Sequence, residues 1–304
     1  MMNNGCIEID GREFAKRLPW RSLDGQKGDY GRILIVGGSA GLGGAPALAA
    51  AGALRAGAGL VRVAMPESLV CGPIAFLAPE AMAQPIAERH GRMICNELLT
   101  WLYTTNPFDV VAIGPGLGQN EETGEIVYSF LKINNRKLVL DADALNLIAS
   151  GPGGIGMIRA SGTGQHILTP HPGEAARLLG KSVGEVVADR LGAARELARL
   201  SGGVAVLKGH GTIVCEEGRE PAICMAGNPG MASGGMGDVL AGIIAALWGQ
   251  GLSAFDAAAL GVWLHATAGD LAAAEQGEES LIARDIVSFL GKAFRKARAG
   301  SSRK

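Results

Sequence analysis

The sequence predicts an α/β protein whose central sheet is mostly parallel. Short runs of valine, isoleucine and leucine alternate with segments of helical length, which is the order expected of right-handed βαβ units in a three-layer α/β/α sandwich. Each run is apolar almost throughout, as in strands that are covered on both faces. Glycine contributes 47 of the 304 residues, about twice its average share of roughly 7%, which indicates many tight turns and backbone-lined loops.

Six apolar runs are the expected parallel strands. They cover residues 32–36, 60–65, 109–113, 137–140, 166–168 and 204–207. Two later runs, 211–216 and 222–226, are separated by charged residues, so we expect a hairpin at an edge of the sheet.

Helices are expected between the strands and towards the end of the chain. Ser182 and Glu185 have the spacing of a capping box, which predicts a helix that continues to about Leu200. Residues 151–164 are rich in glycine and are expected to form a loop. The other expected helices are 45–55, 122–133, 238–247, 255–274 and 283–298.

Composition excludes several classes of protein. A net charge of -1 is not that of a nucleic-acid-binding protein, and a hydrophobic content of 48% excludes global disorder. The two uncharged stretches, 33–54 and 239–255, are interrupted by glycine or proline, so we expect a soluble protein without membrane contact. Five cysteines without a C-x-x-C pair indicate reduced thiols in the cytoplasm and no zinc site.

The expected organisation is one large domain at residues 25–298. An extension at residues 1–24 precedes it, and a frayed tail at residues 299–304 follows it. The first twenty residues contain acidic side chains and no apolar segment, so we do not interpret them as a signal peptide.

The strongest chemical signal is a glycine-rich segment, residues 227–238, that precedes an apolar helix. Bare backbone N–H groups at a helix N-terminus form an anion site. Asp238 ends the segment, and it is either a cap of the helix or a base beside a transferring phosphoryl group. The P-loop pattern is missing, and the G-x-G-x-x-G match at residues 151–156 follows a helical segment, so we interpret that match as chance.

Polar residues follow three of the expected strands. Asp141 and Asp143 follow the strand 137–140, and they either support Mg²⁺ or cap a helix. His171 and Glu174 follow the strand 166–168, at the sheet edge where ligands bind. Lys208 begins a Lys-Gly-His-Gly-Thr run after the strand 204–207, which suits nucleotide phosphates but also fits a surface turn.

These motifs carry a resemblance to a known family. The Gly-Met-Gly-Asp loop at 235–238 resembles that of the ribokinase-like superfamily, although Thr or Ser is common where this chain has Met236. Together with six further segments it resembles the ADP-dependent NAD(P)H-hydrate dehydratase family, in order from about residue 25 to residue 290. The six segments are 27–31, 37–45, 114–118, 140–146, 169–174 and 208–212.

The resemblance implies a repair reaction. The S-epimer of NADH or NADPH that is hydrated at C6 of its nicotinamide ring is phosphorylated on that hydroxyl and then loses phosphate, so that NAD(P)H, AMP and phosphate are released. The resemblance assigns the proton transfer to Asp238, and it assigns substrate contacts to Ala45, Gly116, His171 and Asp238. The nucleotide is assigned to Lys208, Gly209, His210, Gly211, Thr212 and Gly237, and the transferred phosphoryl group to the backbone of Gly235, Met236 and Gly237.

The resemblance also implies Mg²⁺ and ADP, or ATP, as cofactor and co-substrate. Glu174 is either a water-mediated Mg²⁺ contact or a carboxylate at a helix N-terminus. A homotetramer is implied, and a separate NAD(P)H-hydrate epimerase is expected because 24 leading residues are too few for the epimerase domain of bifunctional relatives.

Three alternatives stay open. The first is a small-molecule kinase of the same superfamily that phosphorylates a thiazole or pyrimidine alcohol. The others are a nucleotide-binding regulatory protein and a Rossmann oxidoreductase. Asp238 argues against the regulatory protein, and the misplaced G-x-G-x-x-G match argues against the oxidoreductase.

Overall fold

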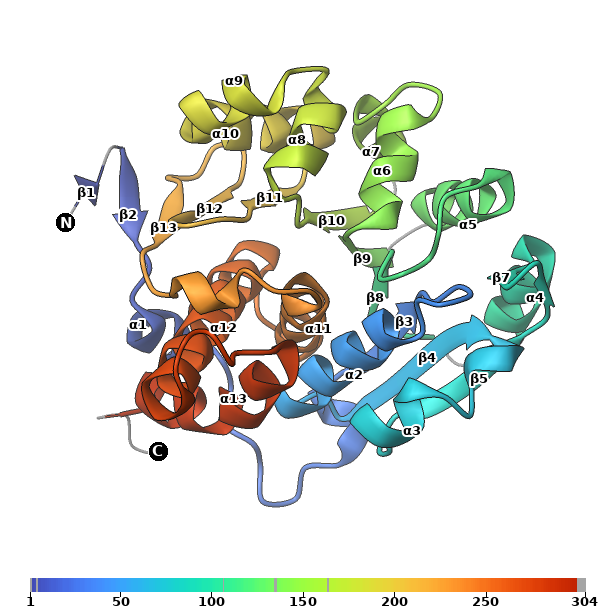
Figure 1. The fold of residues 1–304 in the computed structure, drawn as a ribbon, viewed down its shortest axis with the longest axis horizontal. Helices are drawn as coiled ribbons and strands as arrows, with labels where there is room; N and C mark the ends of the chain where they lie inside the picture. The colour runs from blue at the N-terminus through green and yellow to red at the C-terminus, as the bar shows by residue number, and fades with distance from the viewer. Residues whose placement is uncertain (1, 4, 106, 134–135, 163, 300–304) are drawn as a thin grey trace.

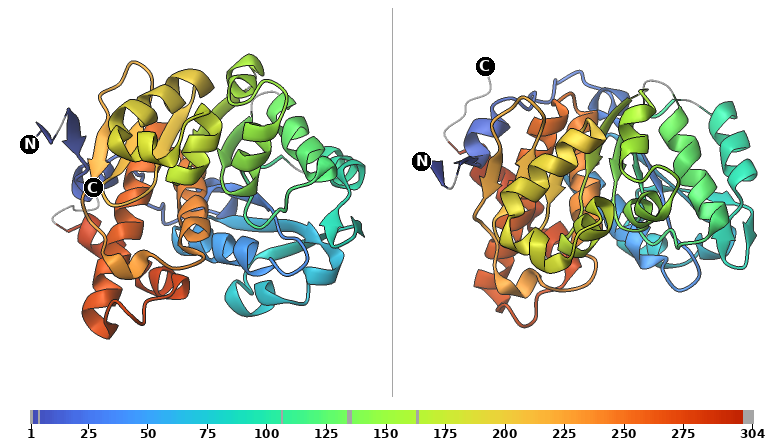
Figure 2. Two further views of the ribbon diagram at one scale, coloured as in Figure 1. Left: turned by 45° about the horizontal axis from the view of Figure 1, so that its top comes forward. Right: turned by 90° about the horizontal axis from the view of Figure 1, so that it is seen from above.

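A long twisted sheet runs across the molecule (Figure 1). The computed structural model describes residues 2–3, 5–105, 107–133, 136–162 and 164–299. Within these ranges the strand order is β1-β2-β13-β12-β11-β10-β9-β8-β3-β4-β5. Figure 2 shows the sheet extending from the dark-blue β1 and β2 on one side of the molecule to the cyan β5 on the other.

The sheet contains all six predicted parallel strands. Their bounds are β3 (Arg32–Val36), β4 (Leu60–Pro66), β8 (Val110–Ile113), β9 (Arg136–Leu140), β10 (Gly164–Leu168) and β11 (Val204–Leu207). The remaining strands are β1 (Met2–Asn3), β2 (Cys6–Glu8), β5 (Met82–Ile86), β12 (Thr212–Cys215) and β13 (Ala222–Cys224). A separate small hairpin consists of β6 (Glu88–Arg89) and β7 (Arg92–Met93).

Helices cover both faces of the sheet, which confirms the predicted α/β sandwich. One face carries α1 (Gly11–Ala15), α2 (Gly44–Arg55), α3 (Pro73–Leu77), α11 (Met236–Gly249), α12 (Ala254–Gln276) and α13 (Ala283–Ala297). The other carries α4 (Cys95–Thr104), α5 (Glu121–Lys132), α6 (Asp143–Ser150), α7 (Gly156–Ala160), α8 (Pro172–Leu179), α9 (Val183–Ala188) and α10 (Arg190–Ser201).

The strands are apolar throughout because each face packs against its own helical layer. In β3, Ile33 and Ile35 belong to one buried core, whereas Leu34 and Val36 belong to the other. All four side chains are fully buried. This arrangement is the physical reason for the nearly continuous apolar runs in the sequence.

The predicted hairpin at residues 211–226 forms, but it is not at an edge of the sheet. β13 pairs antiparallel with β12 and also parallel with β2, where Ala222 is opposite Ile7. β2 in turn pairs with β1. The prediction was wrong because a strand of three residues leaves too short a pattern to be found in the sequence. The expected domain boundary at residue 24 stays a prediction, and residues 300–304 of the expected tail lie outside the described residues.

Two predicted segments differ in detail. Ser182 caps a helix as expected, but α9 ends at Ala188, and Asp189 accepts a hydrogen bond from Gly192 N and begins α10. The expected loop at residues 151–164 contains the short helix α7. No helix within the described ranges is both long and apolar enough to span a membrane.

Candidate active site

The carboxyl ends of the parallel strands bring the predicted polar residues together. Backbone hydrogen bonds continue the pairing one step beyond the strands. Asp141 N donates to Ile113 O (3.1 Å), Thr169 N donates to Leu140 O (3.1 Å), and Lys208 N donates to Pro170 O (2.9 Å). The loops that follow β8, β9, β10 and β11 are therefore in register with one another.

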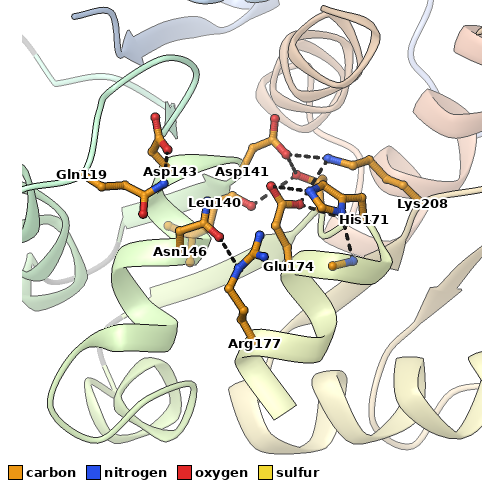
Figure 3. A network of polar contacts seen from close by, with 11 residues as sticks. Gln119, Leu140, Asp141, Asp143, Asn146, His171, Glu174, Arg177 and Lys208 are labelled. Atoms are coloured by element: carbon orange, nitrogen blue, oxygen red, sulfur yellow. Dashed lines mark hydrogen bonds and ion pairs between the residues drawn. The ribbon is translucent and has the colours of Figure 1, made fainter. Parts of the chain in front are cut away.

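Lys208 and Asp141 form an ion pair at the centre of this edge (Figure 3). Lys208 Nζ is 2.9 Å from Asp141 Oδ1 and 3.8 Å from Glu174 Oε2. The exposed fraction of the Lys208 side chain is 18%, and that of Asp141 is 2%. Burial opposes the charge of Lys208, but Asp141 and Glu174 outweigh it and raise its pKa, so the ammonium stays protonated. Thr169 Oγ1 also donates to Asp141 Oδ1, at 2.7 Å.

The predicted anion loop lies beside this ion pair. α11 begins at Met236, and Gly235 precedes it with a φ of 87°, a conformation that favours glycine. A Cβ placed on Gly237 would lie 3.3 Å from Lys208 Nζ and 4.0 Å from Asp141 Oδ2. Because the first N–H groups of a helix have no partner within it, the N-terminus of α11 and Lys208 together favour an anion.

Asp238 is in the first turn of α11 and is half-buried. Burial raises its pKa to about 7, and the negative charge of Asp141 adds to this effect, whereas Lys208 opposes it. A base whose pKa is close to neutral combines a large ionised fraction with useful basicity. This environment favours the catalytic interpretation of Asp238 over that of a simple cap.

His171 and Glu174 form the N-terminus of α8. Gly173 N donates to His171 Nδ1 (3.0 Å), and His171 N donates to Glu174 Oε2 (2.8 Å), so the two residues cap the helix reciprocally. The imidazole is half-exposed, and burial together with Lys208 lowers its pKa, which keeps it neutral. Burial raises the pKa of Glu174 to about 7.

Arg190 holds the loop that contains the predicted nucleotide residues. Its guanidinium donates to the backbone carbonyls of Leu207 (3.2 Å), Lys208 (3.3 Å) and His210. Thr212 Oγ1 donates to Gly209 O (2.9 Å). Gly209 and Gly211 have φ values of 137° and 64°, which explains the glycines of this run, and the side chain of His210 is exposed.

The predicted substrate residues Ala45 and Gly116 are neighbours although 71 positions separate them in the sequence. A Cβ placed on Gly116, whose φ is 60°, would lie 3.1 Å from Ala45 Cβ and 2.6 Å from Leu42 O. Ser39 Oγ donates to Gly116 O (2.9 Å) and joins the two loops. The structure therefore brings the glycine loop after β3 and the Gly-Pro-Gly loop after β8 together.

Asp141 and Asp143 have different roles. Ala142 between them has a φ of 48°, which is a strained conformation for a residue with a side chain. Asp141 contacts Lys208, whereas Asp143 turns away and accepts a hydrogen bond from Gln119 Nε2 (2.7 Å), as Figure 3 shows. The other carboxylate oxygen of Asp143 accepts from Gly118 N (2.8 Å). Asn228 Oδ1 accepts a hydrogen bond from Gly230 N within its own turn, and Asn228 Nδ2 donates to Asp270 on α12.

The donor set fits a Mg²⁺ ion held mainly by nucleotide phosphates and water. Within the described residues no three His, Cys, Asp or Glu side chains converge as a metal cage. Asp141 Oδ2, near Gly237, is the carboxylate oxygen left after Thr169 and Lys208 occupy Oδ1, and Glu174 Oε2 is already engaged by His171 N. Mg²⁺ commonly uses one or two carboxylates and retains several waters.

Sequence reasoning missed Thr169, Arg190 and His265 as parts of the site. Thr169 begins the segment 169–174, Thr-Pro-His-Pro-Gly-Glu, and this segment is its only signal in the sequence. His265 belongs to none of the motifs in the sequence, but its Nε2 donates to Met236 O (2.9 Å) at the start of α11. Arg190, on α10, contacts the loop that contains Lys208 and His210, and it belongs to none of the motifs in the sequence.

The sheet with helices on both faces is the fold of the ribokinase-like class. An ADP/ATP-dependent NAD(P)H-hydrate dehydratase from Bacillus subtilis, co-crystallized with ATP/Mg2+, matches with a TM-score of 0.82 and 28% identity over 97% of this chain and 100% of that chain. A ribokinase-like superfamily protein from Enterococcus faecalis V583 matches with a TM-score of 0.81 and 26% identity over 98% of each chain.

The family model described as NAD(P)H-hydrate dehydratase matches residues 33–291. The chain belongs to this family, as its seven ordered motifs predict. The bifunctional NAD(P)H-hydrate repair enzyme Nnr of Vibrio cholerae is 43% identical over 285 residues, which are 93% of this chain and 53% of the relative. The chain spans about half the length of the curated relatives it matches.

Proposed function

We propose that the protein dehydrates the S-epimer of hydrated NADH or NADPH with ADP as co-substrate and releases NAD(P)H, AMP and phosphate. The observation that carries the proposal is Asp238, a carboxyl group with a pKa of about 7 in the first turn of α11, with Lys208 beside that turn. This pairing of a base with an anion site suits the transfer of a phosphoryl group to a hydroxyl.

In the first step the C6 hydroxyl oxygen attacks the terminal phosphorus of ADP. Asp238 takes the hydroxyl proton, and AMP leaves as the bond between its phosphate and the transferred phosphoryl group breaks. The N–H groups at Gly235, Met236 and Gly237 and the ammonium of Lys208 hold the phosphoryl group. These donors are fixed before the reaction, so they stabilise developing charge without reorganisation.

In the second step the C6–O bond breaks and phosphate leaves with the bonding electrons. The lone pair of the ring nitrogen assists this departure, and loss of a proton from C5 restores the reduced ring. Mg²⁺, when bound, neutralises phosphate charge. Asp141 Oδ2 would hold the ion, and Glu174 would contact it through water.

The proposal includes a homotetramer, a cytoplasmic location and a separate epimerase that supplies the S-epimer. Sedimentation velocity tests the tetramer. All five cysteines are free, and four are buried, which suits a reducing compartment.

The direct test is to incubate the protein with hydrated NADH and ADP and to follow the return of NADH absorbance. The expected result is NADH, AMP and inorganic phosphate in equal amounts, with no isolable phosphorylated cofactor. A thiazole or pyrimidine alcohol incubated with ATP should give no ester. If a stable ester accumulates and the hydrate is not converted, the protein is a kinase instead.

A further inference from the structure

The β6–β7 hairpin packs on the glycine loop that follows β3. Ala40 N donates to Gly91 O (2.8 Å), and Gly91 has a φ of 72° in the turn between the two strands. A Cβ placed on Gly91 would lie only 2.5 Å from Ala40 Cβ, so glycine permits this close approach. The hairpin is therefore fixed beside the loop that leads to Ala45.

Arg92, on β7, directs a buried nitrogen towards the Gly-Pro-Gly loop. Its Nε has no hydrogen-bond partner among the residues that the structure describes. A Cβ placed on Gly118, whose φ is 80°, would lie 3.0 Å from Arg92 Nε and 3.3 Å from Ser39 Oγ. The absence of a side chain at Gly118 therefore makes room for the guanidinium of Arg92. Ser39, which also lies next to Gly118, donates a hydrogen bond to Gly116 O.

No carboxylate among the described residues forms an ion pair with Arg92. Asp143, which holds the other side of Gly118, already accepts one hydrogen bond on each carboxylate oxygen. Glu88 of the same hairpin accepts from Ser68 Oγ (2.8 Å). Arg89 is directly opposite Arg92 in the hairpin, so two like charges face each other. A buried, unpaired N–H on a cation is unfavourable unless a ligand satisfies it.

We propose that Arg92 binds a phosphate group of the dinucleotide substrate, an inference that rests on the proposed function. Asp141 lies near Gly237 at the anion loop, and Asp143, two residues later, holds Gly118 beside Arg92. In the proposed complex the nicotinamide ring lies at Asp238, and the rest of the substrate extends past Gly116 towards the hairpin. Guanidinium groups match the geometry of phosphate oxygens.

Two phosphates of the substrate share this chemistry, namely the pyrophosphate bridge and the ribose phosphate that only the NADPH hydrate carries. The test is Arg92→Gln with both hydrates. Loss of a charge-assisted hydrogen bond should raise KM by about 10- to 100-fold and leave kcat within about threefold. An equal effect on both hydrates identifies the bridge, and an effect on the NADPH hydrate alone identifies the ribose phosphate.

Arg55→Gln is the matched control, because Arg55 is an exposed arginine at the far end of α2. Its kinetic constants should equal those of the wild type. If Arg92→Gln behaves like this control, or raises the KM of ADP as much as that of the hydrates, the proposal is wrong.

Two further measurements distinguish a failure of this inference from a failure of the variant to fold and from a failure of the proposed function. Should Arg92→Gln fail to fold, Arg92→Lys retains the charge but lacks the Nε–H group, and an unchanged KM in that variant would overturn the proposal. If the wild type converts neither hydrate, the dehydratase proposal fails by itself. Calorimetry with NADH and NADPH then tests Arg92, and weaker binding by Arg92→Gln than by Arg55→Gln supports its role.

Discussion

At the scale of single residues, the candidate site has three carboxyl groups around one ammonium group, that of Lys208. Asp141 and Asp238 both lie near Lys208, and Glu174 is 3.8 Å from it. Burial raises the pKa values of Glu174 and Asp238 to about 7, and repulsion from Asp141 adds to this effect. The single ammonium of Lys208 lowers both pKa values but does not cancel the rise. The cluster therefore keeps a proton available where a phosphoryl group would be transferred.

The first prediction concerns Asp238 as the base. Asp238→Asn retains the size of the side chain but cannot take a proton, so the rate should fall by at least about 10²-fold. The circular dichroism spectrum should match that of the wild type. Steady-state turnover of hydrated NADH with ADP measures the effect, and a variant that turns over normally would show that Asp238 is only a helix cap.

The second prediction concerns the pH at which Asp238 ionises. Lys208 lowers the pKa of Asp238 and Asp141 raises it. In the wild type kcat/KM should rise with pH through about 7 as the carboxylate forms. Lys208→Met should move this rise to higher pH, and Asp141→Asn should move it to lower pH.

The two variants control each other, because both alter one charge next to the same base. The measurement is the pH profile of kcat/KM for each variant. Shifts in the same direction, or no shift in either variant, would contradict the assignment of the rising limb to Asp238.

At the scale of elements, the N-terminus of α11 is held by a helix that is remote in sequence. His265 is on α12, is buried, and donates from Nε2 to Met236 O. Burial lowers its pKa to about 4, so the imidazole is neutral at physiological pH. The contact fixes the carbonyl next to the N–H groups that face the expected phosphoryl group.

The third prediction tests this contact. His265→Leu removes the side-chain donor to the buried Met236 carbonyl, which should lower the free energy of unfolding by about 0.5–1.5 kcal/mol. It should also reduce kcat more than it raises the KM of the substrate. His265→Gln can replace the donor and should recover most of both losses. Urea unfolding and steady-state kinetics provide the measurements, and a leucine variant with wild-type kcat would limit His265 to a structural role.

At the scale of the whole molecule, four buried groups link folding stability to pH with opposite signs. The pKa values of His166 and His265 are lowered to about 4, and those of Glu174 and Asp238 are raised to about 7. Between these values the unfolded chain binds more protons at the histidines, whereas the folded chain binds more protons at the carboxyl groups. The two contributions oppose each other, so these groups together should leave stability nearly constant between about pH 5 and pH 6.

The fourth prediction follows from this balance. Asp238→Asn removes one group that binds a proton preferentially in the folded state. The stability of the variant, relative to the wild type, should therefore fall on acidification by about 1.4 kcal/mol per pH unit in the same range. Urea titrations of both proteins without ligand give the slopes. Parallel slopes would mean that the pKa of Asp238 is the same in the folded and unfolded chains.

The fold class and the loops of the candidate site can be predicted from the amino-acid sequence alone. Strands covered on both faces must be apolar throughout, so runs such as 32–36 and 204–207 were visible as strands. The anion loop, the Lys208 run and the His171–Glu174 motif are contiguous in the chain, and each follows a strand or opens a helix. Their position at one edge of the sheet then follows from the parallel order of the strands.

The contacts between these residues, by contrast, depend on tertiary packing. The ion pair of Asp141 with Lys208 joins positions 67 residues apart, and His265 reaches Met236 from another helix. Arg92 faces Gly118 across two loops, and β2 extends the sheet beyond the predicted hairpin. Local sequence patterns reflect the backbone preference and the burial of neighbouring residues. Contacts between remote residues depend on how separate helices and strands pack against each other, and the spacing of residues along the chain does not specify this packing.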